Sequence, residues 1–189
     1  MRRPPGMRVL GLSGSLRRAS INSALLRAAV RLAPAAVTVT LFTELGSLPL
    51  FNPDLDCDAP AAVQALRQAV AAADALLIAS PEYAHGVSGP MKNALDWLVS
   101  FEPFVGKRIA VLNASPRAHH AYQALLETLR TMSAALVPQA CVALPLLGSG
   151  LSEDGMVRDP GVRATIQGVL ENLRQVGAGR DASPSFPVS

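Results

Sequence analysis

The sequence predicts an α/β fold in which five parallel β-strands form one sheet with helices on both faces. Short apolar runs alternate with longer amphipathic segments along the chain, a pattern typical of consecutive βαβ units. Glycine- and proline-containing segments separate these runs and mark the turns. Because the strands are connected through helices, we expect them to run parallel and to be buried on both faces.

The amino-terminal elements follow from the spacing of apolar residues. Residues 8–12 form a short apolar run that predicts a buried strand, and apolar residues recur at helical spacing across residues 20–32. Residues 37–42 alternate and are rich in Val and Thr, which favours a second strand. Residues 48–54 contain prolines, which cannot lie inside a central strand, so an irregular connection is expected. Residues 59–73 are rich in Ala, Leu and Gln and predict a helix.

The rest of the chain repeats this alternation. Residues 75–79 form a third apolar run, which Ser80 and Pro81 bring to an end. The later predicted elements are a helix over residues 89–99, a strand over 108–113, a helix over 122–135, a strand over 141–144 and a helix over 165–176.

One domain is expected, because 189 residues suffice to bury a core without disulfide or metal support. Hydrophobic residues make up 50% of the chain and charged residues 16%, which argues against disorder. We place the domain at residues 8–177, with an N-terminal extension over residues 1–7 and a flexible C-terminal tail over residues 178–189.

The composition excludes several classes of function. The net charge is +3, but the arginines are scattered and aromatic residues make up only 4%, so we expect no nucleic-acid partner. Cys57 and Cys141 form no CxxC pair, which argues against a metal site or a disulfide and favours a reducing, cytoplasmic location. No apolar run approaches the ~18 residues of a membrane helix, so no membrane partner is expected.

The loop after the first strand has the composition of an anion site. In open α/β sheets, ligands bind beyond the carboxyl ends of the strands, which directs attention to the loops after strands one, three and four. Residues 11–22 offer small residues and the start of a helix. They also offer polar side chains suited to a phosphate group: Ser13, Ser15, Arg17, Ser20 and Asn22. The alternative is that Ser20 only caps the helix, and the two roles are compatible.

Other known loop motifs do not fit this segment. A dinucleotide fingerprint requires G-x-G-x-x-G, but Ser13 stands at the second glycine position. A Walker A loop requires glycine followed by lysine and serine or threonine, whereas Gly106-Lys107 is followed by Arg108. A nucleophile elbow requires glycine where Ser15 stands, so Ser13 is not expected to act as a nucleophile.

The loop after the third strand is the second informative segment, and it spans residues 80–97. Pro81 ends the strand, while Gly86 and Gly89 allow a ligand to approach the backbone closely. Tyr83 and His85 add flat side chains with polar tips at the edge where the fold places its ligand. Backbone N–H groups at this edge suit a planar redox ring that gains negative charge on reduction.

Both loops resemble motifs of the NADPH-dependent FMN reductase family, a group of flavodoxin-like proteins that includes quinone, chromate and azo-dye reductases. Residues 14–22 resemble its phosphate-loop motif, G-S-x-R-x-x-S-x-N. Residues 81–97 resemble its ring motif, P-E-Y-N-x-G-x-P-G-x-L-K-N-A-x-D-W. The resemblance extends over roughly residues 8–176, nearly the whole predicted domain.

The resemblance implies a flavodoxin-like three-layer sandwich with strand order 2-1-3-4-5 and a bound FMN. By resemblance, the FMN phosphate is held by Ser13, Ser15, Arg17, Ser20 and Asn22. The flavin ring is implied to lie among Pro81, Glu82, Tyr83, His85 and Gly86, with Ser115 as a further contact. No catalytic residue and no metal ligand is expected, since the chemistry belongs to the cofactor.

The implied activity is an NAD(P)H-dependent oxidoreductase. NADPH or NADH gives hydride to FMN, which passes electrons to a quinone, free flavin, azo compound or metal oxyanion. The resemblance also implies a homodimer or tetramer. Two alternatives stay open at this point: a non-catalytic FMN electron carrier or interaction protein, and a chain that has lost FMN. Arg17 and the basic charge favour the reductase over the carrier.

The chain departs from the family pattern in three places. Ala84 stands where Asn is usual, Ser88 stands where Pro is usual, and residues 114–122 lack the glycines expected after the fourth strand. In that third loop Arg117, with its neighbouring histidines, suits an anionic ligand, although a surface role is favoured for the histidines. Simple structural interpretations are favoured for three more groups: a Lys92–Asp96 surface pair, a buried Trp97 and a structural Glu82.

Overall fold

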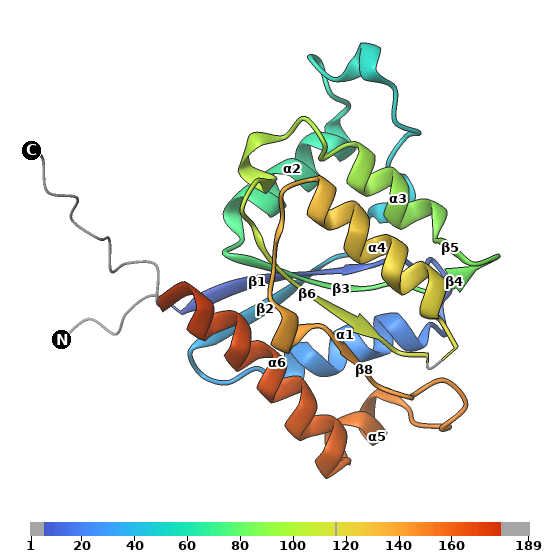
Figure 1. Cartoon of the computed structure of the whole chain (residues 1–189), viewed down its shortest axis with the longest axis vertical. Coiled ribbons are helices and arrows are strands. Elements are labelled where there is room, and N and C mark those ends of the chain that lie inside the picture. The colour runs from blue at the N-terminus through green and yellow to red at the C-terminus, as the bar shows by residue number, and fades with distance from the viewer. Residues whose placement is uncertain (1–5, 116, 179–189) are drawn as a thin grey trace, which may run out of the picture.

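A parallel sheet lies between two layers of helices in the computed structural model, which describes residues 6–115 and 117–178 (Figure 1). The strands are β1 (Met7–Ser13), β2 (Val37–Phe42), β3 (Ala75–Ala79), β4 (Glu82–Tyr83), β5 (Gly86–Val87), β6 (Arg108–Asn113), β7 (Ala135–Leu136) and β8 (Val142–Ala143). The helices are α1 (Ile21–Leu32), α2 (Ala61–Ala72), α3 (Gly89–Asp96), α4 (His119–Thr131), α5 (Glu153–Arg158) and α6 (Pro160–Ala178).

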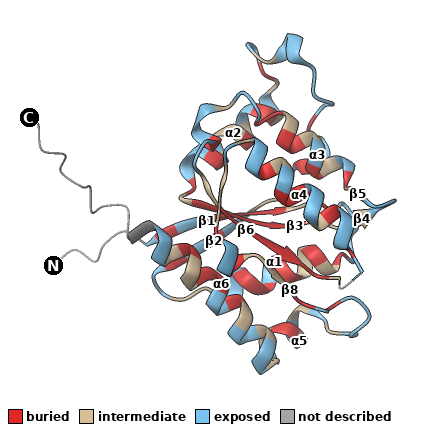
Figure 2. Ribbon diagram, in the orientation of Figure 1, coloured by how far each residue is buried: buried red, intermediate tan, exposed pale blue. Residues whose placement is uncertain are grey.

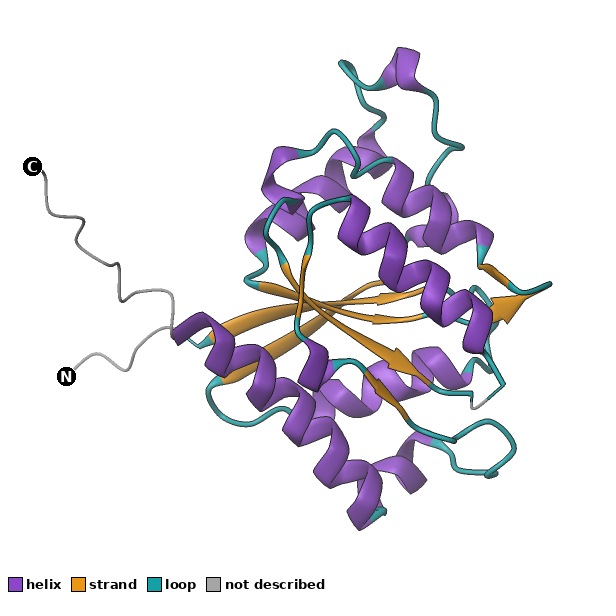
Figure 3. Ribbon diagram, viewed as in Figure 1, coloured by secondary structure: helices purple, strands orange, loops and turns teal. Residues whose placement is uncertain are grey.

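The strand order confirms the flavodoxin-like prediction. The main sheet runs β2-β1-β3-β6, and all its pairings are parallel (Figure 3). At the end of this series, β7 and β8 both pair with β6, one with each end of it. Together they occupy the place of the fifth strand, so the observed order corresponds to 2-1-3-4-5.

The fifth strand is divided for a local reason. Ser133 has a φ of 59°, which stops the helix α4, and β7 begins two residues later. A short 3-10 helix, Pro138–Ala140, then interrupts the pairing before β8, because Pro138 has no N–H to give to a ladder. The sequence-based expectation of a helix reaching residue 135 and one strand over residues 141–144 was wrong at these positions.

Strand residues face the two helical layers alternately. Val9 and Leu77 join the cluster beneath α1 and α6, whereas Leu76 and Ile78 join the cluster beneath α2, α3 and α4. All residues of β3 are buried, as expected for a central strand covered on both faces (Figure 2). The helical layers therefore fix the sheet from both sides and leave its carboxyl edge open for loops.

Several element boundaries differ from the prediction. The helix α4 begins at His119 rather than residue 122, and α6 begins at Pro160 rather than residue 165. Asp159 accepts a hydrogen bond from the Val162 N–H at 2.8 Å, which caps α6, and proline suits a first helical turn. The predicted extension and tail fall mainly on residues 1–5 and 179–189, outside the described residues. Met7, however, already belongs to β1 and Ala178 still belongs to α6.

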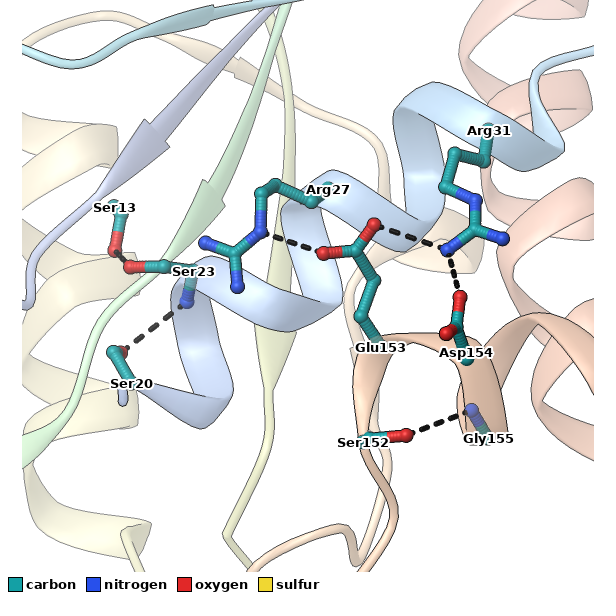
Figure 4. A network of polar contacts seen from close by, with 9 residues as sticks. All are labelled: Ser13, Ser20, Ser23, Arg27, Arg31, Ser152, Glu153, Asp154 and Gly155. Atoms are coloured by element: carbon teal, nitrogen blue, oxygen red, sulfur yellow. Dashed lines mark hydrogen bonds and ion pairs between the residues drawn. The ribbon is translucent and has the colours of Figure 1, made fainter. Parts of the chain in front are cut away.

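The helix α5 was not predicted, and an ion-pair network attaches it to α1 (Figure 4). Arg27 Nε donates to Glu153 at 2.7 Å, and Arg31 Nη1 donates to Glu153 at 3.1 Å and to Asp154 at 2.6 Å. The hydrogen bond from Arg27 is the main reason why the pKa of Glu153 lies below its ordinary value. Both carboxylates also lie in the first turn of α5, where a negative charge is favoured. Across the described residues, no helix is long and apolar enough to cross a membrane.

We predict that Glu153→Gln lowers the free energy of unfolding by about 1 kcal/mol at neutral pH, because it removes the charge that two arginines share. The lowered pKa means that this stabilisation is complete above the ordinary pKa of a glutamate and is lost as the pH falls through the lowered value. Chemical denaturation of the wild type and of Glu153→Gln at several pH values measures this difference in the free energy of unfolding. Glu127→Gln is the control, because Glu127 is 72% exposed and, among the described residues, forms an ion pair with Arg130 alone. Equal stability of the wild type and Glu153→Gln at pH 7 would contradict the prediction.

Candidate functional site

A cavity of about 350 Å³ lies at the carboxyl edge of the sheet, where the loops after β1, β3 and β6 meet. The loop after β1 contributes Ser15, Arg17, Ala19 and the start of α1, and the loop after β3 contributes residues 80–83. The loop after β6 contributes Asn113–Ser115, Arg117 and Ala118, and Leu147 adds an apolar side chain from the segment after β8. The volume lies in the range of small-molecule sites.

The first loop presents backbone and hydroxyl groups to this cavity. Ser20 caps α1, as predicted, by accepting a hydrogen bond from the Ser23 N–H at 3.2 Å. The N-terminus of α1 lines the cavity through Ile21 and Asn22, so its positive end faces a ligand there. Arg17, in the same wall, is exposed and carries a guanidinium group. This combination suits a phosphate group.

Asn22 carries the most informative atom of the site. Its side chain is only 6% exposed, and its Oδ1 atom is buried without a hydrogen-bond partner among the described residues. An unsatisfied buried polar atom costs about 1–3 kcal/mol, and such atoms are rare in folded proteins. Because Asn22 also lines the cavity, a ligand with hydrogen-bonding groups would satisfy it.

The loops after β1 and β3 are joined at Gly14. The Ser88 hydroxyl donates to the Gly14 carbonyl at 2.6 Å and lies 3.1 Å from the Ser80 hydroxyl. The Gly14 N–H donates to the Ala79 carbonyl at 2.9 Å. A Cβ atom on Gly14 would lie 2.7 Å from Ser88 Oγ and 2.8 Å from Ser80 Cβ, so only glycine permits this approach. Ser88 is the residue at which the family pattern has proline, and its hydroxyl group makes the connection.

The loop after β3 contains a hairpin that the sequence did not reveal. The strands β4 and β5 pair antiparallel, with Tyr83 opposite Gly86. Between them, Ala84 has a φ of 48° and His85 a φ of 60°, so both residues of the turn are left-handed. This is the geometry of a type I′ hairpin turn, which normally selects Asn and Gly. The Asn expected at position 84 from the family pattern therefore has a backbone role that Ala84 fills under strain.

Glu82 has the structural role that was favoured from the sequence. Its Oε2 atom accepts a hydrogen bond from the Ala121 N–H at 2.8 Å, in the first turn of α4. The residue that precedes α4, Ala118, has no side chain able to cap the helix, so Glu82 supplies the missing acceptor. The carboxylate also lines the cavity. Glu82 thus fixes the hairpin wall against α4.

The third loop is organised by Asn113, a residue that sequence reasoning missed. Its side-chain amide donates to the Ala118 carbonyl at 3.0 Å, and its Oδ1 accepts from the Ser115 N–H at 3.0 Å. It thereby shapes a loop that lacks the expected glycines. A polar residue at the end of an apolar strand was the available signal. Leu147 was missed as well, because nothing local connects the segment after β8 to this cavity.

Eight of the eleven predicted contact residues line this cavity. They are Ser15, Arg17, Ser20, Asn22, Pro81, Glu82, Tyr83 and Ser115. Ser13, His85 and Gly86 do not line it. The Ser13 hydroxyl lies 2.8 Å from the Ser23 hydroxyl and faces a second cavity, and His85 stacks on His120 with ring centroids 4.3 Å apart. The contact of all eleven residues with FMN stays a prediction.

Two further interpretations are confirmed. Trp97 is fully buried, and its ring N–H donates to the Pro49 carbonyl at 2.8 Å, so it belongs to the core. Lys92 and Asp96 form the expected pair one helical turn apart, at 2.5 Å. Neither Trp97 nor the Lys92–Asp96 pair lines the cavity.

Comparison with known proteins identifies a matching family. The family model described as NADPH-dependent FMN reductase matches residues 7–146. The chain is 44% identical over 112 residues to an NAD(P)H-dependent FMN reductase of Pseudomonas aeruginosa, covering 58% of this chain and 60% of that protein. It is 34% identical over 113 residues to a quinone reductase of Escherichia coli, with 58% of this chain and 60% of that protein covered. The chain thus spans less than two thirds of the length of these relatives.

A solved structure resembles most of the chain. The flavoenzyme FerB of Paracoccus denitrificans, an NAD(P)H:(acceptor) oxidoreductase, superposes with a TM-score of 0.75 at 28% identity. The superposition covers 89% of this chain and 98% of that one. The similarity therefore extends over most of both chains.

We predict that Ala84→Gly raises the free energy of unfolding by about 1 kcal/mol, because glycine adopts a left-handed conformation without the cost borne by alanine. Ala124→Gly is the matched control. Ala124 is an exposed residue in the middle of α4, where the same substitution should lower stability by a similar amount. Urea denaturation of both variants measures the two effects. Destabilisation by Ala84→Gly would show that the hairpin turn is not strained.

Proposed function

The chain belongs to the NADPH-dependent FMN reductase family, and on this premise we propose that it is an FMN-dependent NAD(P)H oxidoreductase whose acceptors are small molecules such as quinones. The relatives named above support both halves of the proposal, since one is an FMN reductase and another a quinone reductase. The observation that carries it in this molecule is the orphaned Oδ1 atom of Asn22, at the N-terminus of α1 in the cavity. A polar ligand bound there, beside an anion site, would satisfy this atom.

The residues present fit an FMN phosphate and its polyhydroxyl chain. Arg17 and Ser15 supply donors for phosphate oxygens, and the first turn of α1 adds backbone N–H groups and a favourable dipole. Asn22 Oδ1 would accept a hydrogen bond from a ligand hydroxyl group, which would remove the cost of its burial. Ser20 fixes the start of the helix and thereby the direction of these groups.

The other loops provide a place for the ring. Pro81, Glu82 and Tyr83 form one wall, and Tyr83 is 58% exposed, so its ring is accessible to a ligand. The second wall is the loop that Asn113 holds in shape, with Ser115 in the cavity. Leu147 adds an apolar side chain to this space. When bound, FMN supplies the redox chemistry by accepting hydride from NAD(P)H and returning electrons to an acceptor.

The task of the protein's own residues is therefore to bind FMN and to orient it. The Glu82 oxygen that is bonded to the Ala121 N–H is committed to the helix, so this carboxylate positions the wall. The link from Ser88 to Gly14 fixes the separation of the phosphate loop from the hairpin. Both contacts hold the site in shape before a ligand arrives, which lowers the cost of binding.

A homodimer or tetramer in the cytoplasm completes the proposal. Exposed apolar side chains support the oligomer: Leu50 is 84% exposed and Leu55 41%. The segment that contains them, residues 48–58, projects from the body of the domain (Figure 1). Apolar side chains gathered on a projecting loop are typical of protein contact surfaces.

Anaerobic reduction of the FMN-loaded protein tests the function. We expect purified protein incubated with FMN to retain a visible flavin absorption band, and NADPH or NADH to bleach it, because the cofactor accepts hydride in this site. A quinone added afterwards should restore the band. Retention of FMN without bleaching would contradict the reductase proposal and identify an electron carrier. Absence of FMN binding would contradict the cofactor assignment itself.

Arg17→Gln provides the specificity control for this measurement. We expect it to raise the dissociation constant for FMN by about 10- to 100-fold, since a charged hydrogen bond to phosphate is worth about 1.5–3 kcal/mol. Arg130→Gln removes the same charge from α4, outside the cavity, and should leave the constant unchanged. Quenching of flavin fluorescence on binding measures the dissociation constant for FMN in the wild type, Arg17→Gln and Arg130→Gln.

A further inference from the structure

A second cavity, of about 380 Å³, adjoins the first across the phosphate loop. Ser15 and Arg17 line both cavities, so this loop forms a common wall. The remaining walls are α1, through Ser23 and Arg27, and the segment that follows β2, residues 41–47. The proposed function gives this cavity no role.

The lining of the second cavity is strongly basic. Three arginines, Arg17, Arg18 and Arg27, take part in it, and no acidic residue does. Arg27 engages Glu153 through its Nε atom, and its terminal amino groups make no hydrogen bond among the described residues (Figure 4). Arg18 is exposed and forms no ion pair with the described part of the chain. Arg17 likewise has no ion-pair partner there, so a bound anion would give these two guanidinium groups a counter-charge.

Hydroxyl groups and an apolar surface complete the lining. Thr43 and Ser47 lie on the segment after β2, and the Ser13–Ser23 hydroxyl pair lies on the opposite side, on β1 and α1. Leu26, Leu41 and Phe42 supply apolar surface, including one aromatic ring. Guanidinium and hydroxyl groups suit a phosphate monoester, and an aromatic ring beside leucines suits a purine base. The ligand class is therefore a phosphorylated nucleoside.

We propose that the second cavity binds the 2′-phosphoadenosine end of NADPH and thereby selects NADPH over NADH. The assignment rests on the proposed function, which brings a nicotinamide dinucleotide to the adjoining cavity. The shared wall allows one extended ligand to reach both spaces. NADH lacks the 2′-phosphate, so Arg18 and Arg27, which line the second cavity and not the first, distinguish the two nucleotides.

The test uses the FMN-loaded full chain and the variant Arg18→Gln, because Arg18 lines only the second of the two cavities. We expect this variant to raise the KM for NADPH, relative to that for NADH, by about tenfold. Calorimetric titration with adenosine 2′,5′-bisphosphate should show a similar loss of affinity, and adenosine 5′-monophosphate should bind weakly to both proteins. Ser47→Asp places a negative charge in the cavity. It should also raise the KM for NADPH relative to that for NADH and weaken the binding of adenosine 2′,5′-bisphosphate. Arg130→Gln, on the other helical layer, is the charge-matched control.

Three outcomes overturn the assignment. Equal changes in the KM for NADPH and NADH would remove the basis for selection by the 2′-phosphate. Unchanged affinity of both variants for adenosine 2′,5′-bisphosphate would place that group elsewhere. A loss of FMN affinity in Arg18→Gln would assign the second cavity to the flavin phosphate. In each case bleaching of wild-type FMN by NAD(P)H leaves the proposed function intact, whereas no bleaching by either nucleotide overturns both.

Discussion

The close approach of Gly14 to Ser80 and Ser88 is the contact on which the site depends. Gly14 belongs to the phosphate loop, and the two serines lie at the ends of the segment that forms the hairpin wall. The hydroxyl of Ser88 is buried and directed at the Gly14 carbonyl, so the two loops behave as one unit. The helical layers cover both faces of the sheet and the cavity lies at its carboxyl edge, so this contact decides how the phosphate and ring ends of the cavity are spaced.

The architecture could be predicted from the sequence because strands that are buried on both faces are continuous apolar runs, which are easy to recognise. Apolar runs such as residues 75–79 have no alternating pattern, and the segments between them repeat with helical spacing. The divided fifth strand could not be predicted. A left-handed Ser133 and the placement of Pro138 depend on tertiary contacts, and the short pairs of β7 and β8 carry too few residues to show a periodicity.

The candidate site was partly predictable for the same reason. Ser15, Arg17 and Asn22 follow a strand directly, so the position of the strand end determines where they lie. Ser13 could not be placed from the sequence, because it is still part of β1 and its direction follows the pleat of the strand. The hairpin also stayed hidden, since Ala84 and His85 are unusual residues for a left-handed turn. Leu147 reaches the cavity only through the placement of the segment between β8 and α5.

The dissociation constant of the Gly14→Ala variant for FMN tests the central claim most directly. Gly14 does not have a positive φ, so alanine adds only a methyl group directed at Ser80 and Ser88. The account predicts that this methyl group separates the two loops and weakens FMN binding by at least about tenfold, because small displacements of binding groups are costly. The variant should keep the circular dichroism spectrum of the wild type, since the contact lies outside both hydrophobic clusters. Wild-type affinity for FMN in this variant would show that the two loops do not act as one unit.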